Sequence, residues 1–131
     1  MSHLLQRIIE LPFWLRAIFF IVVSAGLLFT GLRSQPIPQI FAQEDKVHHF
    51  IGFMVLSFSC RFAFLQVKPY WIALGCLLAG LSIEYAQIFF PQRTASLFDA
   101  VANACGVLTG LLIAWHYAQP KKIKEQTICT R

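Results

Sequence analysis

The chain has 131 residues, a length that allows one domain. Hydrophobic residues make up 57% of it and charged residues only 13%, whereas soluble domains carry about 25% charged residues. This composition excludes an ordinary soluble domain and predicts an integral membrane protein whose partner is the lipid bilayer. The net charge of +5 does not predict a nucleic-acid partner, because the basic residues lie at the ends of apolar runs, where membrane topology accounts for them.

The N-terminal part predicts a surface helix followed by a membrane span. Residues 1–12 place Leu and Ile on one side and Gln, Arg and Glu on the other, a pattern typical of a short interfacial helix. Residues 13–32 then form an apolar segment long enough to cross the hydrocarbon layer. A cleaved signal peptide is the alternative interpretation, but no A-x-A-like site follows, so we favour an uncleaved span.

The remaining sequence predicts three more spans, at residues 47–65, 70–90 and 100–118. The short connection between the first two of these allows only a turn, so they are antiparallel neighbours. The predicted fold is an all-α membrane protein with four transmembrane helices and a short N-terminal interfacial helix. Its parts are the interfacial helix at residues 1–12, the transmembrane domain at residues 13–118 and a basic cytoplasmic tail at residues 119–131.

The distribution of basic residues predicts the orientation of the spans. If the N-terminus is cytoplasmic, only three of the 11 Lys and Arg residues lie on the outer side, namely Arg33, Lys46 and Arg93. The other eight lie on the cytoplasmic side. Because cytoplasmic loops of membrane proteins carry an excess of Lys and Arg, both termini are predicted to be cytoplasmic.

This orientation gathers most of the unexplained polar residues at the outer ends of the spans. Asp45 and His49 are four residues apart, Glu84 and Gln87 three, and Asp99 and Asn103 four, so each pair shares one face of a helix. Carboxylates and amides in hydrocarbon are costly, and they mark a functional site or a set of mutual partners. The candidate site comprises Asp45, Lys46, His49, Glu84, Gln87, Arg93, Ser96, Asp99 and Asn103.

The residue types leave the role of Glu84 and His49 open. Glu84 either makes a structural contact, to Arg93 or to Asn103, or accepts a proton in a reaction. His49 beside Asp45 is arranged as a base with an orienting carboxylate, yet a histidine in the first turn of a span is also an ordinary interfacial residue.

A metal site is not predicted from this pattern. Adjacent His48 and His49 point about 100° apart on a helix and do not readily bind one ion together. We therefore predict no metal and no cofactor.

Gly106 and Gly110 in the fourth span form a G-x-x-x-G spacing, which lets two helix backbones approach closely. We interpret both as packing residues rather than members of the site. The closest helix contacts are predicted along the glycine faces of the third and fourth spans.

Two motifs resemble those of VanZ-like proteins. Residues 45–53, D-K-V-H-H-F-I-G-F, resemble the D-K-x-x-H-F motif that opens this family, with His49 at the position of the family histidine. The second motif is matched in order and spacing by Glu84, Gln87, Pro91, Arg93, Ser96, Asp99, Asn103, Gly106 and Gly110. The resemblance implies a small multi-pass protein of the bacterial cytoplasmic (inner) membrane, linked to the cell envelope. The family name comes from a member associated with low-level teicoplanin resistance, and the resemblance supplies no reaction.

Three functions are compatible with these observations. The favoured one is a VanZ-like envelope protein that binds an amphiphilic or anionic ligand in an outward-facing polar pocket, with Arg93 and Lys46 meeting the headgroup. The second is a membrane enzyme acting on a lipid or cell-wall precursor, with Glu84 or His49 as general base. The third is a structural or assembly factor whose polar residues only connect helices. The sequence leaves open whether a reaction occurs and what the oligomeric state is.

Overall fold

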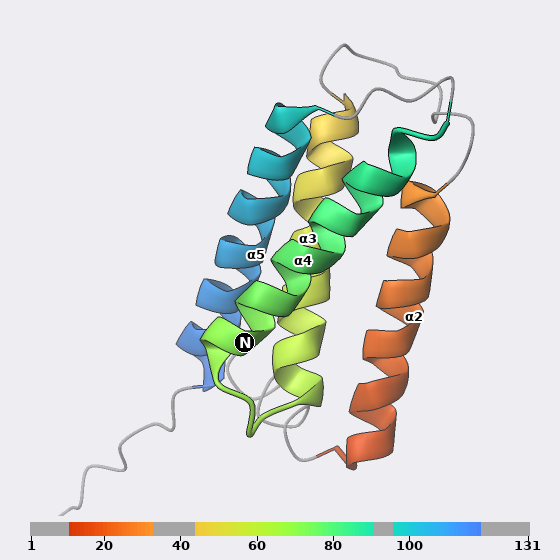
Figure 1. The fold of residues 1–131 in the computed structure, drawn as a ribbon. Coiled ribbons are helices and arrows are strands. Elements are labelled where there is room, and N and C mark those ends of the chain that lie inside the picture. Colours follow the sequence, from red (N-terminus) through yellow and green to blue (C-terminus); the bar gives the residue numbers. More distant parts are fainter. Residues whose placement is uncertain (1–10, 33–43, 91–95, 119–131) are drawn as a thin grey trace, which may run out of the picture.

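The computed structural model describes residues 11–32, 44–90 and 96–118. Within these ranges the regular structure is helical throughout, which confirms the all-α prediction. The helices are α2 (Phe13–Gly31), α3 (Glu44–Ala63), α4 (Pro69–Gln87) and α5 (Leu97–Ala118). They run alternately in opposite directions along one bundle (Figure 1). The predicted interfacial helix and the basic tail fall outside the described residues, apart from the last two residues of the former.

Three of these helices, α2, α4 and α5, are long and apolar enough to cross a membrane. Helix α3 is as long, but Glu44, Asp45 and Lys46 stand at its start and Arg61 at its end. It begins three residues earlier than predicted, because acidic residues in a first turn are stabilised by the positive end of the helix dipole. The fourth membrane span therefore stays a prediction.

Helix α3 is the central element of the bundle and contacts the other three helices. It buries seven residues, whereas α2 buries none. Buried polar groups such as Ser57 and Ser59 therefore face protein rather than lipid, which explains why the most polar helix is also the innermost one.

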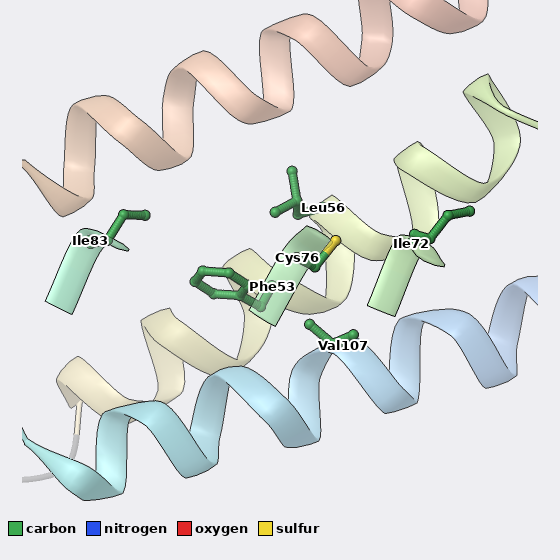
Figure 2. Close-up of a cluster of buried hydrophobic side chains, with 6 residues drawn as sticks. All are labelled: Phe53, Leu56, Ile72, Cys76, Ile83 and Val107. Carbon is green, nitrogen blue, oxygen red and sulfur yellow. The ribbon is translucent and has the colours of Figure 1, made fainter. Parts of the chain in front are cut away.

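The apolar core lies between α3, α4 and α5. It is formed by Phe53 and Leu56 of α3, by Ile72, Cys76 and Ile83 of α4 and by Val107 of α5 (Figure 2). Helix α2 adds only partly buried side chains such as Phe20 and Leu27 to this cluster. Since lipid is as apolar as these residues, close van der Waals contact rather than exclusion of water holds such helices together.

The closest helix contact joins α5 to α3, and we call it the seam. A Cβ atom added at Gly106 would overlap the carbonyl oxygen of Phe50, and one added at Gly110 would overlap the carbonyl oxygen of Met54. The predicted close approach is therefore made by α5, and its partner is α3. On α4, a Cβ at Gly80 would lie 3.2 Å from side-chain atoms of Asn103 and Phe53, whereas a Cβ at Gly75 would meet nothing within 4 Å.

The opposite side of α3 is loosely packed. An apolar space of about 380 Å³, which we call the crevice, lies between α2, α3 and α4. Its lining includes Phe20 and Leu27 of α2, Leu56 and Cys60 of α3, and Gly75 and Ile83 of α4. Figure 1 shows α2 set apart on this side of the bundle, while α5 lies close along the other.

At the end of the bundle where α2 begins and α3 ends, arginines bind backbone carbonyls. Arg16 Nη1 donates to the carbonyl oxygen of Phe62 at 2.9 Å, which ties α2 to the last turn of α3. Arg61 Nη1 donates to the carbonyl oxygen of Leu65 at 2.8 Å. Because the last carbonyls of a helix have no partner within it, both contacts satisfy groups at the C-terminal end of α3.

Candidate functional site

Six of the nine predicted site residues come together at the other end of the bundle, where α3 and α5 begin and α4 ends. We call this group the polar cluster; it consists of Asp45 and His49 on α3, Glu84 and Gln87 on α4, and Asp99 and Asn103 on α5. Each helix contributes two residues spaced by one turn, so their side chains share one face. His49, Glu84, Gln87, Asp99 and Asn103 are all buried.

His49 is the link between the three helices. Its Nδ1 lies 3.0 Å from Asn103 Oδ1 and 3.8 Å from Glu84 Oε1. Because an amide oxygen only accepts hydrogen bonds, Nδ1 carries a proton in this arrangement, and in the neutral ring Nε2 then has a lone pair. The contact with α5 therefore fixes both the orientation and the tautomer of the ring.

Glu84 is the least satisfied member of the polar cluster. Its residue is 8% exposed, and neither carboxylate oxygen has a hydrogen-bond partner among the described residues. The side chains of Asp45 and Asp99 act on it as like charges, and the backbone of Ser96 approaches it. The Asn103 Nδ2 group also has no hydrogen-bond partner among the described residues, so the amide does not bind this carboxylate. A buried carboxylate whose nearest basic partner is a histidine at 3.8 Å is costly, which makes Glu84 a candidate for a role beyond packing.

Gln87 connects the polar cluster to α2. Its Nε2 donates to the carbonyl oxygen of Gly31 at 2.8 Å. The residue is 3% exposed. This hydrogen bond satisfies a carbonyl in the last turn of α2 and joins the ends of α2 and α4 next to the cluster.

A small cavity opens beside the polar cluster. It has a volume of about 50 Å³, and Asp45, His49 and Gln87 contribute its polar lining together with His48 and Thr30. Water needs roughly 10–15 Å³ of such space per molecule, so this cavity has room for a few small polar groups. Leu27 and Ile83 line both this cavity and the crevice, so the small cavity with its polar groups and the apolar crevice are neighbours.

Of the remaining predicted residues, the structure describes Lys46 and Ser96, which lie at the beginnings of α3 and α5. Lys46 is partly buried at the start of α3 and makes no ion pair with the described part of the chain. The Ser96 hydroxyl accepts a hydrogen bond from the Phe98 backbone N–H at 3.2 Å and thereby caps α5. Arg93 lies outside the described residues. His48 has an exposed side chain that borders the small cavity, and its Nε2 lies 3.9 Å from Glu44 Oε1.

One arrangement in the polar cluster was missed by the sequence analysis. Asp45, His49 and Asp99 each offer a metal-ligating atom, and these atoms lie within 4.8 Å of one another. The sequence analysis tested the adjacent pair His48 and His49, which diverge in the structure as expected from their spacing. The sequence analysis placed Asp99 at the same end of the bundle. Its position against the first turn of α3 depends on the packing of α5 on α3, and residue spacing within one helix does not show which helices pack together.

A bundle of apolar helices with a buried polar cluster at one end defines a helical membrane protein. A family model described as VanZ/LLP1 matches residues 3–118, and the chain therefore belongs to the VanZ/LLP1 family, as its motifs predicted. It is also similar to an uncharacterized protein of Schizosaccharomyces pombe, with 32% identity over 115 residues that cover 83% of this chain and 67% of the relative. No solved structure matches this chain at a significant level.

Proposed function

We propose that this protein binds a membrane amphiphile, with the headgroup at the polar cluster and the hydrocarbon chain in the crevice. The observation that carries the proposal is that the small cavity beside the polar cluster and the crevice are neighbours that share Leu27 and Ile83 as lining residues. An amphiphile needs a polar and an apolar site in direct succession, and few other ligands do. The volume of the crevice, about 380 Å³, suits one hydrocarbon chain, whose approach from the bilayer requires no passage through water.

The membrane arrangement follows from the same bundle. Helix α3 has 20 residues and is therefore about 30 Å long, which is the thickness of the hydrocarbon layer. Its polar residues face protein, and it lies antiparallel between helices that are apolar enough to span. We therefore favour four spans with both termini in the cytoplasm, which places the polar cluster on the outer side. If the chain is bacterial, the membrane is the cytoplasmic membrane of the cell envelope.

The ligand class is proposed from the similarity of this chain to a fungal protein. This similarity favours a phospholipid, which every membrane contains, over a precursor of the bacterial cell wall. Lys46 and Arg93 are the cations that would meet its phosphate, since both belong to the outer side in this orientation.

A link to teicoplanin is a separate part of the proposal. It predicts that expression in a glycopeptide-sensitive Gram-positive host lowers susceptibility to teicoplanin, and equal susceptibility with and without the protein would exclude it.

Gly75 provides the test of amphiphile binding. A side chain at this position projects into the crevice and meets no atom within 4 Å of its Cβ, so Gly75→Leu fills the crevice without breaking a contact. Gly26→Leu is the matched control, because its Cβ also meets nothing within 4 Å and the residue lies outside the crevice lining.

Native mass spectrometry of the protein released from lipid nanodiscs measures the bound ligand. We expect wild type and Gly26→Leu to retain one phospholipid and Gly75→Leu to lose at least about nine-tenths of it, a tenfold change in occupancy that corresponds to about 1.4 kcal/mol. Equal retention by all three proteins would contradict a ligand in the crevice.

A membrane enzyme is the second candidate, favoured by His49. In the neutral ring that donates from Nδ1 to Asn103, Nε2 has a lone pair, and the ring lines the small cavity. A general base needs this combination of a free lone pair and access to substrate. In this case lipid supplied in nanodiscs would be converted to a product by wild type and not by His49→Gln, whereas pure binding predicts an unchanged lipid in both.

A further inference from the structure

Cys60 and Cys76 form a pair of thiols that neither the polar cluster nor the headgroup proposed there uses. Cys60 belongs to α3 and Cys76 to α4, and their side chains are hydrogen-bonded to each other. Both are free thiols in the structure. Cys76 is 4% exposed and belongs to the apolar core, as Figure 2 shows, and Cys60 is half-buried against that core. The two helices therefore hold two thiols in direct contact.

The α3–α4 hairpin accounts for this contact. Helix α3 ends at Ala63 and α4 begins at Pro69, so the two helices are antiparallel with a short turn between them. Each cysteine lies eight residues from Lys68 in this turn, Cys60 before it and Cys76 after it. Residues at equal distances from the turn of two antiparallel helices lie at about the same height. The contact thus belongs to the fold and does not require a ligand in the crevice.

Both thiols also line the crevice. The described residues around this space contribute no charged side chain, and the Ser24 hydroxyl in its lining already donates to the carbonyl oxygen of Phe20 at 2.8 Å. The thiols are therefore the oxidisable nucleophiles that a molecule in the crevice would meet. Such a molecule arrives from hydrocarbon rather than from water. The oxidant that a bilayer itself supplies is a hydroperoxide on an oxidised acyl chain.

We infer that Cys60 and Cys76 are a redox-active dithiol, which a lipid hydroperoxide oxidises to a disulfide between α3 and α4. The sulfur of Cys60, the more accessible of the two, attacks the outer peroxide oxygen. The O–O bond breaks, the thiol proton passes to the other oxygen, and an alcohol leaves while Cys60 becomes a sulfenic acid. The sulfur of Cys76 then forms the S–S bond and releases water. Two thiols thus supply the two electrons that reduce one hydroperoxide.

The contact between the thiols supports both steps. The attacking species is the thiolate, and an S–H group of Cys76 directed at the Cys60 sulfur stabilises the negative charge that develops there. The same contact places the second thiol next to the sulfenic acid. A resolving cysteine at this place forms the disulfide before the sulfur is oxidised further, which keeps the reaction reversible.

The orientation favoured above makes the dithiol the resting state. Cys60 lies within the last turn of α3, which ends at Ala63, and this end of the bundle is the cytoplasmic one in that orientation. Thiols in the cytoplasm are kept reduced. Oxidation ties α3 to α4 along one wall of the crevice, and reduction releases them.

The experiment uses the full chain in detergent, freed of lipid, reduced with dithiothreitol and then separated from it. The chain has four cysteines, so a variant with Cys105→Ser and Cys129→Ser keeps only the pair. This variant is treated with cumene hydroperoxide, an apolar organic hydroperoxide, and with hydrogen peroxide at the same concentration. Non-reducing peptide mapping identifies the disulfide, and chromatography measures the cumyl alcohol.

We expect one disulfide between Cys60 and Cys76 and one cumyl alcohol per chain. The reaction should be about tenfold faster with cumene hydroperoxide than with hydrogen peroxide, because reactivity follows the access of the oxidant to the thiol. The oxidised protein should have a higher Tm, because the disulfide restricts the unfolded chain. Dithiothreitol should reverse both changes.

Single substitutions separate the roles of the two thiols. Cys60→Ser should leave the hydroperoxide unreduced, whereas Cys76→Ser should stop at a sulfenic acid on Cys60, which dimedone traps. Cys105→Ser alone is the matched control, since Cys105 is exposed on α5, and it should behave like the wild type. Circular dichroism verifies that the variants are helical.

Two results would overturn the inference. One is the absence of a Cys60–Cys76 disulfide in the variant that keeps only this pair. The other is oxidation by hydrogen peroxide at the same rate as by cumene hydroperoxide, which would show that the thiols are reached from water and not through the crevice. Because the protein is free of lipid, disulfide formation and the retention of a phospholipid are separate outcomes, and either can fail without the other.

Discussion

The two sides of α3 are packed in opposite ways. On one side, Gly106 and Gly110 bring the backbone of α5 into contact with that of α3. On the other side, α2 buries no residue and a crevice of about 380 Å³ separates the helices. In a bilayer, helices associate through close packing and hydrogen bonds, because lipid competes equally for apolar side chains. The seam therefore fixes the polar groups of α3 and α5 against each other, whereas the crevice leaves space for a hydrocarbon chain.

The largest expected effect comes from breaking the seam. Gly106→Ala places a Cβ against the Phe50 carbonyl and the Met54 backbone nitrogen, which cannot move without displacing α3. We expect a loss of about 3 kcal/mol or more in the free energy of unfolding, measured by denaturation in mixed micelles. Gly26→Ala, whose Cβ meets nothing, is the control and should change stability by less than about 1 kcal/mol. Equal effects of the two substitutions would show that α5 does not lie against α3.

A smaller effect is expected where the crevice meets the polar cluster. Gln87→Leu leaves the Gly31 carbonyl without its donor and frees the end of α2 from α4. The expected loss of stability is about 1–2 kcal/mol, together with faster hydrogen exchange in the last turn of α2. Gln66→Leu, at an exposed position in the turn before α4, is the control. Unchanged exchange in α2 would contradict the role of Gln87.

The hydroxyl of Ser57 contributes the side-chain hydrogen bond that crosses the seam in mid-bundle. Its Oγ lies 3.1 Å from the carbonyl oxygen of Val107 on α5 and 3.1 Å from that of Met54 on α3. Ser57→Ala should cost about 0.6 kcal/mol, a typical value for such a bond between membrane helices. Ser82→Ala removes a hydroxyl that binds only within α4 and should cost less. A double-mutant cycle with Gly110→Ala would show whether the two contacts act together.

Glu84→Gln has the smallest expected effect on the fold. The carboxylate has a weakly placed set of partners, with His49 Nδ1 at 3.8 Å, and the substitution removes one of three neighbouring negative charges. We expect the free energy of unfolding to stay the same or to rise by about 1 kcal/mol, measured as in the seam experiment. Glu44→Gln, at a partly buried position beside His48, provides the comparison. A marked fall in abundance of Glu84→Gln would instead support a purely structural role.

The sequence predicts the helices and the members of the polar cluster well. It predicts less well which helix packs against which. Apolar segments and Pro12 place the start of α2 correctly, and spacing by one turn puts Asp45 with His49 and Asp99 with Asn103 on single faces. Helical periodicity gives the face and the end of a helix on which a residue lies. It does not give the helix that this face meets, because several arrangements bury the same stripe. The seam between α5 and α3 and the approach of Asp99 to His49 could therefore be found only in the structure.

The polarity of α3 is a second case in which the sequence does not predict the position of a helix in the bundle. Its charged first turn lowers its hydropathy below that of its neighbours, which makes it the weakest span by composition. In the bundle α3 nevertheless contacts all three other described helices, so the weakest span occupies the central position. The buried polar side chains of α3, His49, Ser57 and Ser59, are explained by this position, and composition alone gives no sign of it.

Photolabelling tests the contrast between seam and crevice most directly. A phospholipid with a photoreactive group in its acyl chain is incorporated sparsely into nanodiscs with the protein, and labelled residues are mapped by mass spectrometry. We predict that labelling of Phe20, Leu56 and Ile83 exceeds that of the outward-facing Val22 and Leu112, and that Gly75→Leu removes the excess. Labelling that is uniform over the outward faces and unchanged in Gly75→Leu would contradict a lipid chain in the crevice.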